Sequence, residues 1–208
     1  DVVRKLVSHV RENGAGHNYL IQHSAGSGKS NSIAWTAYRM ASLHDENNNP
    51  IFDSVIIVTD RRVLDQQLQA TVSGFDHTID EKKNSGDLRD AINDGKRIII
   101  STLQKFPVIY DEVHSSVGKH YAVIVDEAHS SQTGQSALKL KAALADVSDA
   151  LQEYAELEEK AVEEIEKNDP LVQEMLSQGK HQNMSFFAFT ATPKGKTLEI
   201  FGEPQPDG

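Results

Sequence analysis

The sequence predicts an α/β fold with three layers, in which helices cover both faces of a mainly parallel sheet. Five short apolar runs, rich in β-branched and aromatic residues, have the length and composition of strands buried on both faces. Helical patterns lie between these runs, and such alternation is typical of doubly wound sheets. Polar or glycine-containing segments directly follow several runs. Candidate ligand-binding residues are therefore expected at the carboxyl ends of the strands.

The elements can be assigned in order along the chain. Residues 1–13 form an amphipathic helical pattern. The expected strands are Tyr19–Gln22, Ser54–Thr59, Arg97–Ser101, Ala122–Asp126 and Phe186–Thr190. The expected helices between them are Ser30–Leu43, Arg61–Gly74, Asp87–Asp94 and Leu103–Val108. The segments His44–Pro50 and Asp80–Asp87 are polar and are predicted to be exposed loops.

Residues 135–180 interrupt the alternation of strands and helices and predict a helical insertion. Its apolar residues recur at spacings of three and four, at Leu140, Leu144, Val147, Leu151 and Tyr154. The opposite face is acidic, because residues 141–170 carry ten acidic and three basic side chains. A helical hairpin packed on the sheet or against a neighbour fits this pattern better than a self-associating coiled coil.

Composition indicates one globular domain. The chain has 208 residues, of which 38% are hydrophobic and 25% charged, and we predict a single domain that is a fragment of a larger chain. The net charge of −10 argues against a simple nucleic-acid binder, although most of this charge lies in the insertion. No apolar run approaches the roughly 20 residues of a membrane span. The absence of cysteine excludes disulfides and is compatible with a cytoplasmic location.

The segment after the first strand predicts a phosphate-binding loop. It contains Ala25, Gly26, Ser27, Gly28, Lys29 and Ser30, and it leads directly into a helix. Unpaired N–H groups at a helix start, together with the helix dipole, favour an anion there. Lys29 would reach the outer phosphates, and the Ser30 hydroxyl would coordinate Mg²⁺. The usual first glycine of such a loop is replaced by His23, which sits at the strand exit where a side chain is tolerated.

Acidic residues at the end of the fourth strand complete a candidate ATP site. Asp126 and Glu127 follow an apolar run, as does the carboxylate that holds Mg²⁺ in phosphate-loop enzymes. Asp126 is the candidate metal ligand, and Glu127 is placed to activate the attacking water as a general base. The sequence has no N-K-x-D motif for guanine, so ATP is the expected nucleotide.

Five motifs in order make the chain resemble the superfamily 2 helicases and translocases. It looks most like the motor region of the restriction subunit of type I restriction-modification enzymes. The motifs are "HSAGSGKS", "IIVTDRRVLDQQLQ", "IIISTLQKF", "DEAH" and "FFAFTATP". In that subfamily a histidine commonly stands where His23 does. The resemblance implies a RecA-like fold, ATP and Mg²⁺ as cofactors, and double-stranded DNA as the substrate.

The resemblance also implies roles for individual residues. His129 would act with Lys29, Asp126 and Glu127 in the catalytic group. Arg61, Arg62 and Thr102 would contact the DNA backbone, and Thr190 and Thr192 would couple the ATP state to the DNA surface. Hydroxyls and cations at strand ends can grip phosphates without reading bases. From the residues alone, ordinary helix capping explains Thr102 equally well.

The resemblance extends beyond this chain. A second motor lobe would supply an arginine finger, so we expect weak nucleotide binding and negligible hydrolysis by this lobe alone. A nuclease domain and the methylation and specificity subunits are the other expected partners. Another superfamily 2 helicase acting on DNA or RNA, and a nucleotide-dependent switch or scaffold, stay open as alternatives. We expect Trp35 to pack in the core, and the remaining histidines lack the spacing of metal ligands.

Overall fold

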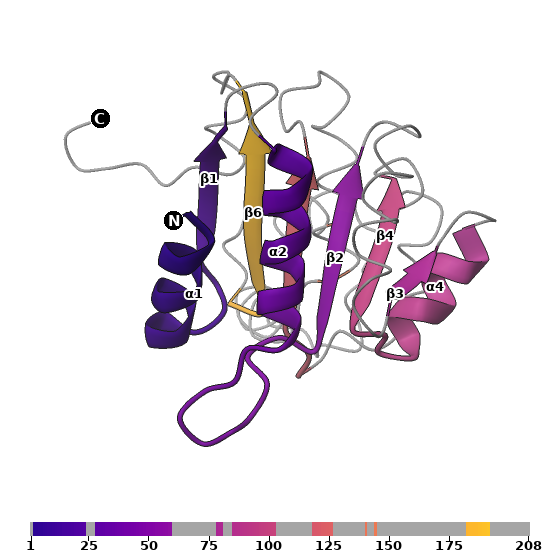
Figure 1. The fold of residues 1–208 in the computed structure, drawn as a ribbon. Helices are drawn as coiled ribbons and strands as arrows, with labels where there is room; N and C mark the ends of the chain where they lie inside the picture. The colour runs from indigo at the N-terminus through magenta and orange to yellow at the C-terminus, as the bar shows by residue number, and fades with distance from the viewer. Residues whose placement is uncertain are drawn as a thin grey trace, which may run out of the picture.

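The computed structural model describes residues 2–23, 28–59, 78–80, 85–102, 118–126, 140, 144 and 182–191, with the backbone alone for 78–80 and 85–87. Three helices and six strands lie in these ranges (Figure 1). The helices are α1 (Val2–Asn13), α2 (Lys29–Ala41) and α4 (Ser85–Asn93). The strands are β1 (Asn18–Gln22), β2 (Ser54–Thr59), β3 (Thr78–Asp80), β4 (Ile98–Thr102), β5 (Tyr121–Asp126) and β6 (Met184–Thr190).

The strands form one parallel sheet in the order β1-β6-β5-β2-β4-β3. This confirms the α/β fold class. Each of the five predicted strands is present, with its boundaries within two residues of the predicted ones. Their near-continuous apolar sequence has the expected cause, because every residue of β2, β5 and β6 is buried.

One strand was not predicted. The polar segment Asp80–Asp87 was expected to be a loop, but Asp80 ends β3 and Ser85 begins α4. β3 has three residues and pairs with β4 at the edge of the described sheet, so it is too short for an apolar pattern to stand out. The predicted helices Arg61–Gly74 and Leu103–Val108 lie outside the described residues.

A hydrophobic core lies on each face of the sheet. α1 and α2 lie side by side over one face (Figure 1), where Ile33, Met40 and Phe187 are fully buried. On the other face, Leu88 of α4 packs in a second cluster together with Leu140 and Leu144. Those two leucines are helical and are the described part of the predicted insertion. The sheet is therefore the middle layer of three.

Trp35 is not a core residue, contrary to the prediction. Its side chain is 49% exposed, whereas its neighbours Ala34 and Thr36 are fully buried. Successive residues of a helix are rotated by about 100°, so Trp35 falls on the outer side of α2 while the buried stripe faces the sheet. The large apolar side chain suggested burial, but its helical phase places it outside.

The segment His44–Pro50 is an exposed turn, as predicted. An isolated antiparallel bridge joins His44 to Pro50, and Asn48 adopts a positive φ of 63°. The Asp45 carboxylate accepts hydrogen bonds from the backbone N–H groups of Asn47 and Asn49, at 2.9 and 2.8 Å. These hydrogen bonds, that of Asn49 first, lower the pKa of Asp45 because they favour the charged form.

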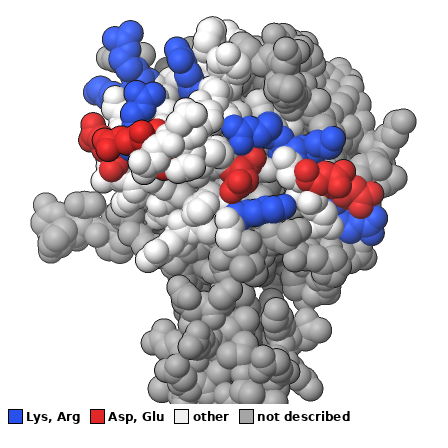
Figure 2. Space-filling model, turned by 90° about the horizontal axis from the view of Figure 1, so that it is seen from below, with Lys and Arg blue, Asp and Glu red and all other residues white. Residues whose placement is uncertain are grey.

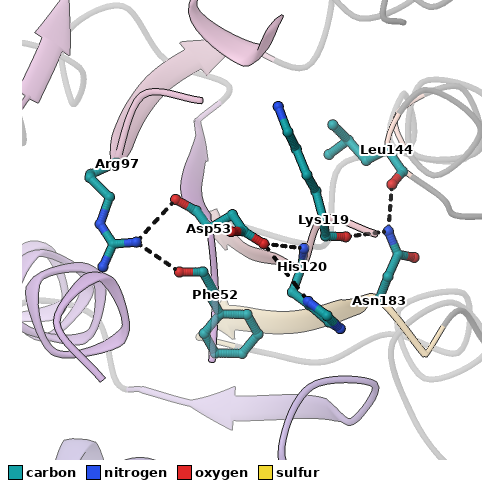
Figure 3. Close-up of polar contacts among 7 residues, drawn as sticks. All are labelled: Phe52, Asp53, Arg97, Lys119, His120, Leu144 and Asn183. Atoms are coloured by element: carbon teal, nitrogen blue, oxygen red, sulfur yellow. Dashed lines mark hydrogen bonds and ion pairs between the residues drawn. The ribbon is translucent and has the colours of Figure 1, made fainter. Parts of the chain in front are cut away.

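Polar contacts join the elements at the amino-terminal edge of the sheet (Figure 3). Arg97 donates from Nη1 to the carbonyl oxygens of Phe52 and Asp53, and from Nη2 to that of Ala41 at the end of α2. Asn183 donates from Nδ2 to the carbonyl oxygens of Lys119 and Leu144. Cationic and anionic side chains both lie on this face (Figure 2). These contacts fix the segments that lead into β2, β5 and β6.

Candidate functional site: the carboxyl edge of the sheet

The carboxyl ends of the neighbouring strands β1, β6 and β5 place several predicted site residues at one edge. Asp126 is the last residue of β5, Thr190 is the last of β6, and His23 follows β1 directly. Lys29 is the first residue of α2, the helix that follows β1. The strand order therefore brings together residues that are far apart in the sequence.

The start of α2 depends on a glycine. Gly28 is the N-cap residue and has φ 82° and ψ 31°, which is the left-handed region that favours glycine. As a glycine, it has no side chain that could cap the helix start. The first N–H groups of a helix have no partner within the helix, so this end can bind an anion. Ala25, Gly26 and Ser27 lie outside the described residues, and Ser30 lies in the first turn of α2.

Lys29 and Asp126 form an ion pair, with Nζ 3.1 Å from Oδ1. The two side chains are 13% and 2% exposed, so water screens the contact weakly. The same Asp126 oxygen has no hydrogen-bond partner, so the ammonium is close to it without the alignment of a hydrogen bond. A buried carboxylate oxygen that lacks a hydrogen bond keeps its capacity to accept another positive group.

His23 connects three elements of the site. Its backbone N–H donates to the carbonyl oxygen of Thr190 at 2.9 Å, which extends the pairing of β1 with β6. Its ring Nε2 is hydrogen-bonded to Ser32 Oγ at 3.1 Å, in the first turn of α2. The ring also lies 6.5 Å from that of Phe189. The side chain thus holds the phosphate-loop helix against the strand exit, which the sequence did not indicate.

Ser32 is a site residue that the sequence interpretation missed. It lies outside the loop motif, and its only signal is a polar side chain one turn into the helix. The carbonyl oxygen of Ser32 also accepts a hydrogen bond from Thr36 Oγ1 at 2.7 Å. Ser32 is therefore bonded through its hydroxyl to His23 at the strand exit, and through its carbonyl oxygen to the next turn of the same helix.

The strands β2 and β4 end side by side at the same edge. Thr59, the last residue of β2, pairs in register with Thr102, the last residue of β4. Thr59 is fully buried and Thr102 is partly exposed. Thr190 is also fully buried, so its side chain does not reach the surface. Of the other predicted site residues, Arg61, Arg62, Glu127, His129 and Thr192 lie outside the described residues.

The described part of the chain shows neither a metal-binding cluster nor a membrane-spanning helix. Within the described ranges, no group of three or more histidine and carboxylate side chains is placed to hold a metal ion. The helices described there are also too short or too polar to span a bilayer.

The fold and this edge define a class of protein. A parallel sheet with a glycine-capped helix after its first strand, and a lysine at that helix start paired with an aspartate at a neighbouring strand end, is the arrangement of a phosphate-loop ATPase domain. The sequence matches the SWI2/SNF2 ATPase family over residues 1–150. The match covers more than half of the chain, which therefore belongs to that family.

Two solved structures resemble the chain in fold. One is a hypothetical ATP-dependent RNA helicase from Sulfolobus tokodaii, with 15% identity and a TM-score of 0.49, covering 96% of this chain and 49% of that one. The other is the NS3-like helicase from Alongshan virus, with 12% identity and a TM-score of 0.47, covering 86% of this chain and 34% of that one. This chain therefore spans half or less of each. No curated protein sequence matches it.

Proposed function

We propose that this chain is the ATP-binding first motor lobe of an ATP-dependent double-stranded DNA translocase of a type I restriction enzyme. The observation that carries the nucleotide part is the contact between Lys29 and Asp126, 3.1 Å apart at the carboxyl edge. It joins the phosphate loop to the acidic motif, the two parts that an ATPase must bring together. The five motifs in order, with a histidine at position 23, favour the restriction subfamily.

Lys29 has two roles in this proposal. Before nucleotide binds, its ammonium balances the buried charge of Asp126, to which it is adjacent. When a triphosphate reaches the start of α2, Lys29 turns toward the outer phosphates, and the N–H groups after Gly28 bind the same anion. The lysine thereby exchanges one negative partner for another.

Asp126 and Ser30 are the residues that would hold Mg²⁺. Asp126 fits this role because its Oδ1 is buried and accepts no hydrogen bond, and carboxylate oxygen is a ligand that Mg²⁺ prefers. The bound ion would neutralise charge on the phosphates. Glu127, next in the chain, would accept a proton from the attacking water.

DNA would lie along the same edge of the sheet, beyond β2 and β4. Arg61 and Arg62 follow β2, and Thr102 ends β4 beside Thr59. Cations and hydroxyls at adjacent strand ends suit a phosphodiester backbone. Thr190 at the end of β6, and Thr192 two residues later in the sequence, would pass the state of the nucleotide to this surface. A second lobe, a nuclease domain and the methylation and specificity subunits would complete the enzyme.

Nucleotide binding can be tested on the chain itself. A fluorescent ATP analogue with Mg²⁺ should bind, and Lys29→Ala should weaken it by roughly 100-fold, because a charge-assisted contact to phosphate is lost. Lys96→Ala removes an exposed lysine in the turn before β4 and is the matched control. Equal affinity of the Lys29→Ala and Lys96→Ala chains would refute a phosphate role for Lys29.

The motor part requires the full-length protein. Glu127→Gln keeps the shape of the side chain but removes the general base, so ATP-dependent displacement of a DNA triplex should stop while ATP still binds. If displacement survives this change, the chain is not a motor of this type. Strong preference for single-stranded RNA would favour a helicase instead.

The restriction subfamily has its own test. Cleavage of unmethylated DNA by the full-length protein with methylation and specificity subunits should require ATP and be blocked by Lys29→Ala. ATP-independent cleavage, or movement along DNA without any cleavage, would remove the restriction assignment and leave the motor assignment in place.

A further inference from the structure

A groove lies between α1 and α2, on the outer side of these helices. Its volume is about 520 Å³, and Val3 and Val7 of α1 and Trp35 of α2 are among the residues that line it. The three arginines Arg4, Arg11 and Arg39 also line it. The proposed roles in ATP and DNA binding use none of these six side chains. At its other end the groove reaches Asn31 and Ser32 in the first turn of α2, next to the proposed phosphate site.

The groove is positively charged on a chain of net charge −10. Its lining includes no carboxylate. Arg4, Arg11 and Arg39 are exposed, and none of them forms an ion pair with another residue in the described part of the chain. Unbalanced guanidinium groups around one groove favour an anionic occupant.

The apolar side chains of the groove favour an occupant with an apolar part. Among the described residues, the exposed large hydrophobic side chains are Val2 on α1, and Trp35 and Tyr38 on α2, which are 40%, 49% and 38% exposed. They lie on the two helices that form the groove. Tryptophan, tyrosine and arginine together are the residues enriched where proteins bind each other tightly.

The position of the arginines separates this groove from the phosphate site. Arg11 and Arg39 lie in the last turns of α1 and α2. Arg39 is ten residues beyond Lys29, which corresponds to roughly 15 Å along the helix axis. A nucleotide with its phosphates at the start of α2 would leave these cations unbalanced. An occupant that carries its own negative charge at the far end of the groove would balance them.

We propose that the α1–α2 groove is a docking site for an acidic segment of a partner protein. The segment presents carboxylates to Arg11 and Arg39 and an aliphatic side chain to Trp35, Val3 and Val7. Carboxylates suit the arginines because a guanidinium group can bind them with two parallel hydrogen bonds. The end of the groove with Arg11 and Arg39 requires neither nucleotide nor DNA, whereas its other end is lined by Ser32, which contacts His23 at the proposed phosphate site.

Trp35 provides the measurement, because it is the only tryptophan of the chain. The probe is a synthetic peptide rich in glutamate with one central leucine, titrated at low salt without ATP. We expect a saturable shift of tryptophan emission that weakens as salt is added, because exposed charges are screened. The combined change Arg11→Glu and Arg39→Glu should weaken binding by roughly tenfold or more.

Two controls keep the result interpretable. Lys96→Glu reverses an exposed charge in the turn before β4, at a residue that does not line the groove, and should leave peptide affinity unchanged. The milder changes Arg11→Gln and Arg39→Gln replace the charge reversal if that variant does not fold, and each should still weaken binding. A peptide with lysine in place of every glutamate should give no saturable shift.

Several results would overturn the proposal. They are the absence of a saturable shift with the acidic peptide, an equal shift with the lysine peptide, and an unchanged affinity in the arginine variants. Displacement of the peptide by ATP would show instead that the groove belongs to the nucleotide site. Sedimentation that shows a dimer dissociated by the same arginine changes would make a second copy the occupant.

Discussion

At the scale of single residues, His23 has the most unexpected position. It stands where phosphate loops usually have a glycine, and its ring contacts Ser32 while its backbone contacts Thr190. One residue therefore touches the helix that starts the phosphate site and the strand assigned to coupling. This position gives His23 a means to affect how the start of α2 is held.

A double-mutant cycle tests this role of His23. His23→Ala and Ser32→Ala should each weaken nucleotide affinity about fivefold, since a hydrogen bond contributes about 1 kcal/mol. The double variant should be no worse than either single one, because both remove the same contact. Ser42→Ala, which removes a hydroxyl at the other end of α2, is the control. Fully additive losses would contradict a shared role.

Tyr121 gives a prediction for alkaline pH. Burial, and secondarily the charge of Asp53, raise the pKa of Tyr121 from 10.0 to about 12. The neutral form is thus favoured in the folded state, so its contribution to stability is complete below pH 10 and is lost as the pH rises through about 12. Tyr121→Phe should remove this component of the decline, as measured by urea unfolding between these pH values.

The same variant has a second expected result at neutral pH. The Tyr121 hydroxyl is buried and has no hydrogen-bond partner, so removing it should leave the free energy of unfolding unchanged or slightly higher. A clear loss of stability in Tyr121→Phe at pH 7 would contradict the absence of a partner for this hydroxyl.

At the scale of elements, α2 is fixed at both ends. Its first turn is held by His23, and its last carbonyl oxygens by Arg97 and Ser42. Arg97 leads into β4, so one side chain joins the end of α2, the start of β2 and the start of β4. A planar group with several donors is required for this, and lysine lacks it.

Arg97→Lys should therefore lower the free energy of unfolding by about 1–3 kcal/mol, because partly buried carbonyl oxygens lose their donors. Arg89→Lys is the matched control, since Arg89 pairs with its exposed neighbour Asp90 on the surface of α4. The expected effect of the control is below about 0.5 kcal/mol. Equal effects of the two changes in urea unfolding would show that the contacts of Arg97 contribute little.

The limits of sequence interpretation are clearest at this scale. β2 and β5 are continuous apolar runs, so burial on both faces could be predicted. β3 could not, because three residues at a sheet edge carry no pattern. Likewise, the contact of His23 with Ser32 depends on how a helix leaves a strand. The outward position of Trp35 follows from its phase on α2, whereas the prediction of burial relied on its hydrophobicity alone.

At the scale of the whole molecule, the sheet has a core on each face, and both cores should unfold together. Leu144 is fully buried in the second core, and its carbonyl oxygen accepts a hydrogen bond from Asn183. It lies in the segment that begins the predicted acidic insertion. Its packing decides whether that segment contributes to the stability of the domain.

Leu144→Ala should lower the free energy of unfolding by about 2–5 kcal/mol, because a buried leucine leaves a cavity. Val2→Ala, at a position that is 40% exposed on α1, should change it by less than about 0.5 kcal/mol. Calorimetry should show a single transition for each variant. If Leu144→Ala unfolded at the same midpoint temperature as the wild type, the helical segment around Leu144 would not be part of the cooperative core.

The pairing of β1 has a consequence for how the protein is made. Within the described sheet, β1 is an edge strand whose hydrogen-bonded neighbour is β6, and Asn18 pairs with Phe186. The strand that leads into the phosphate loop therefore leaves the ribosome before its partner, because Phe186 follows Asn18 by 168 residues in the sequence. At a synthesis rate of roughly 5–20 residues per second, the interval between the synthesis of β1 and that of β6 is on the order of ten seconds or more. A growing chain therefore carries β1 without this neighbour until β6 has been made, and this edge of the proposed nucleotide site is completed only then.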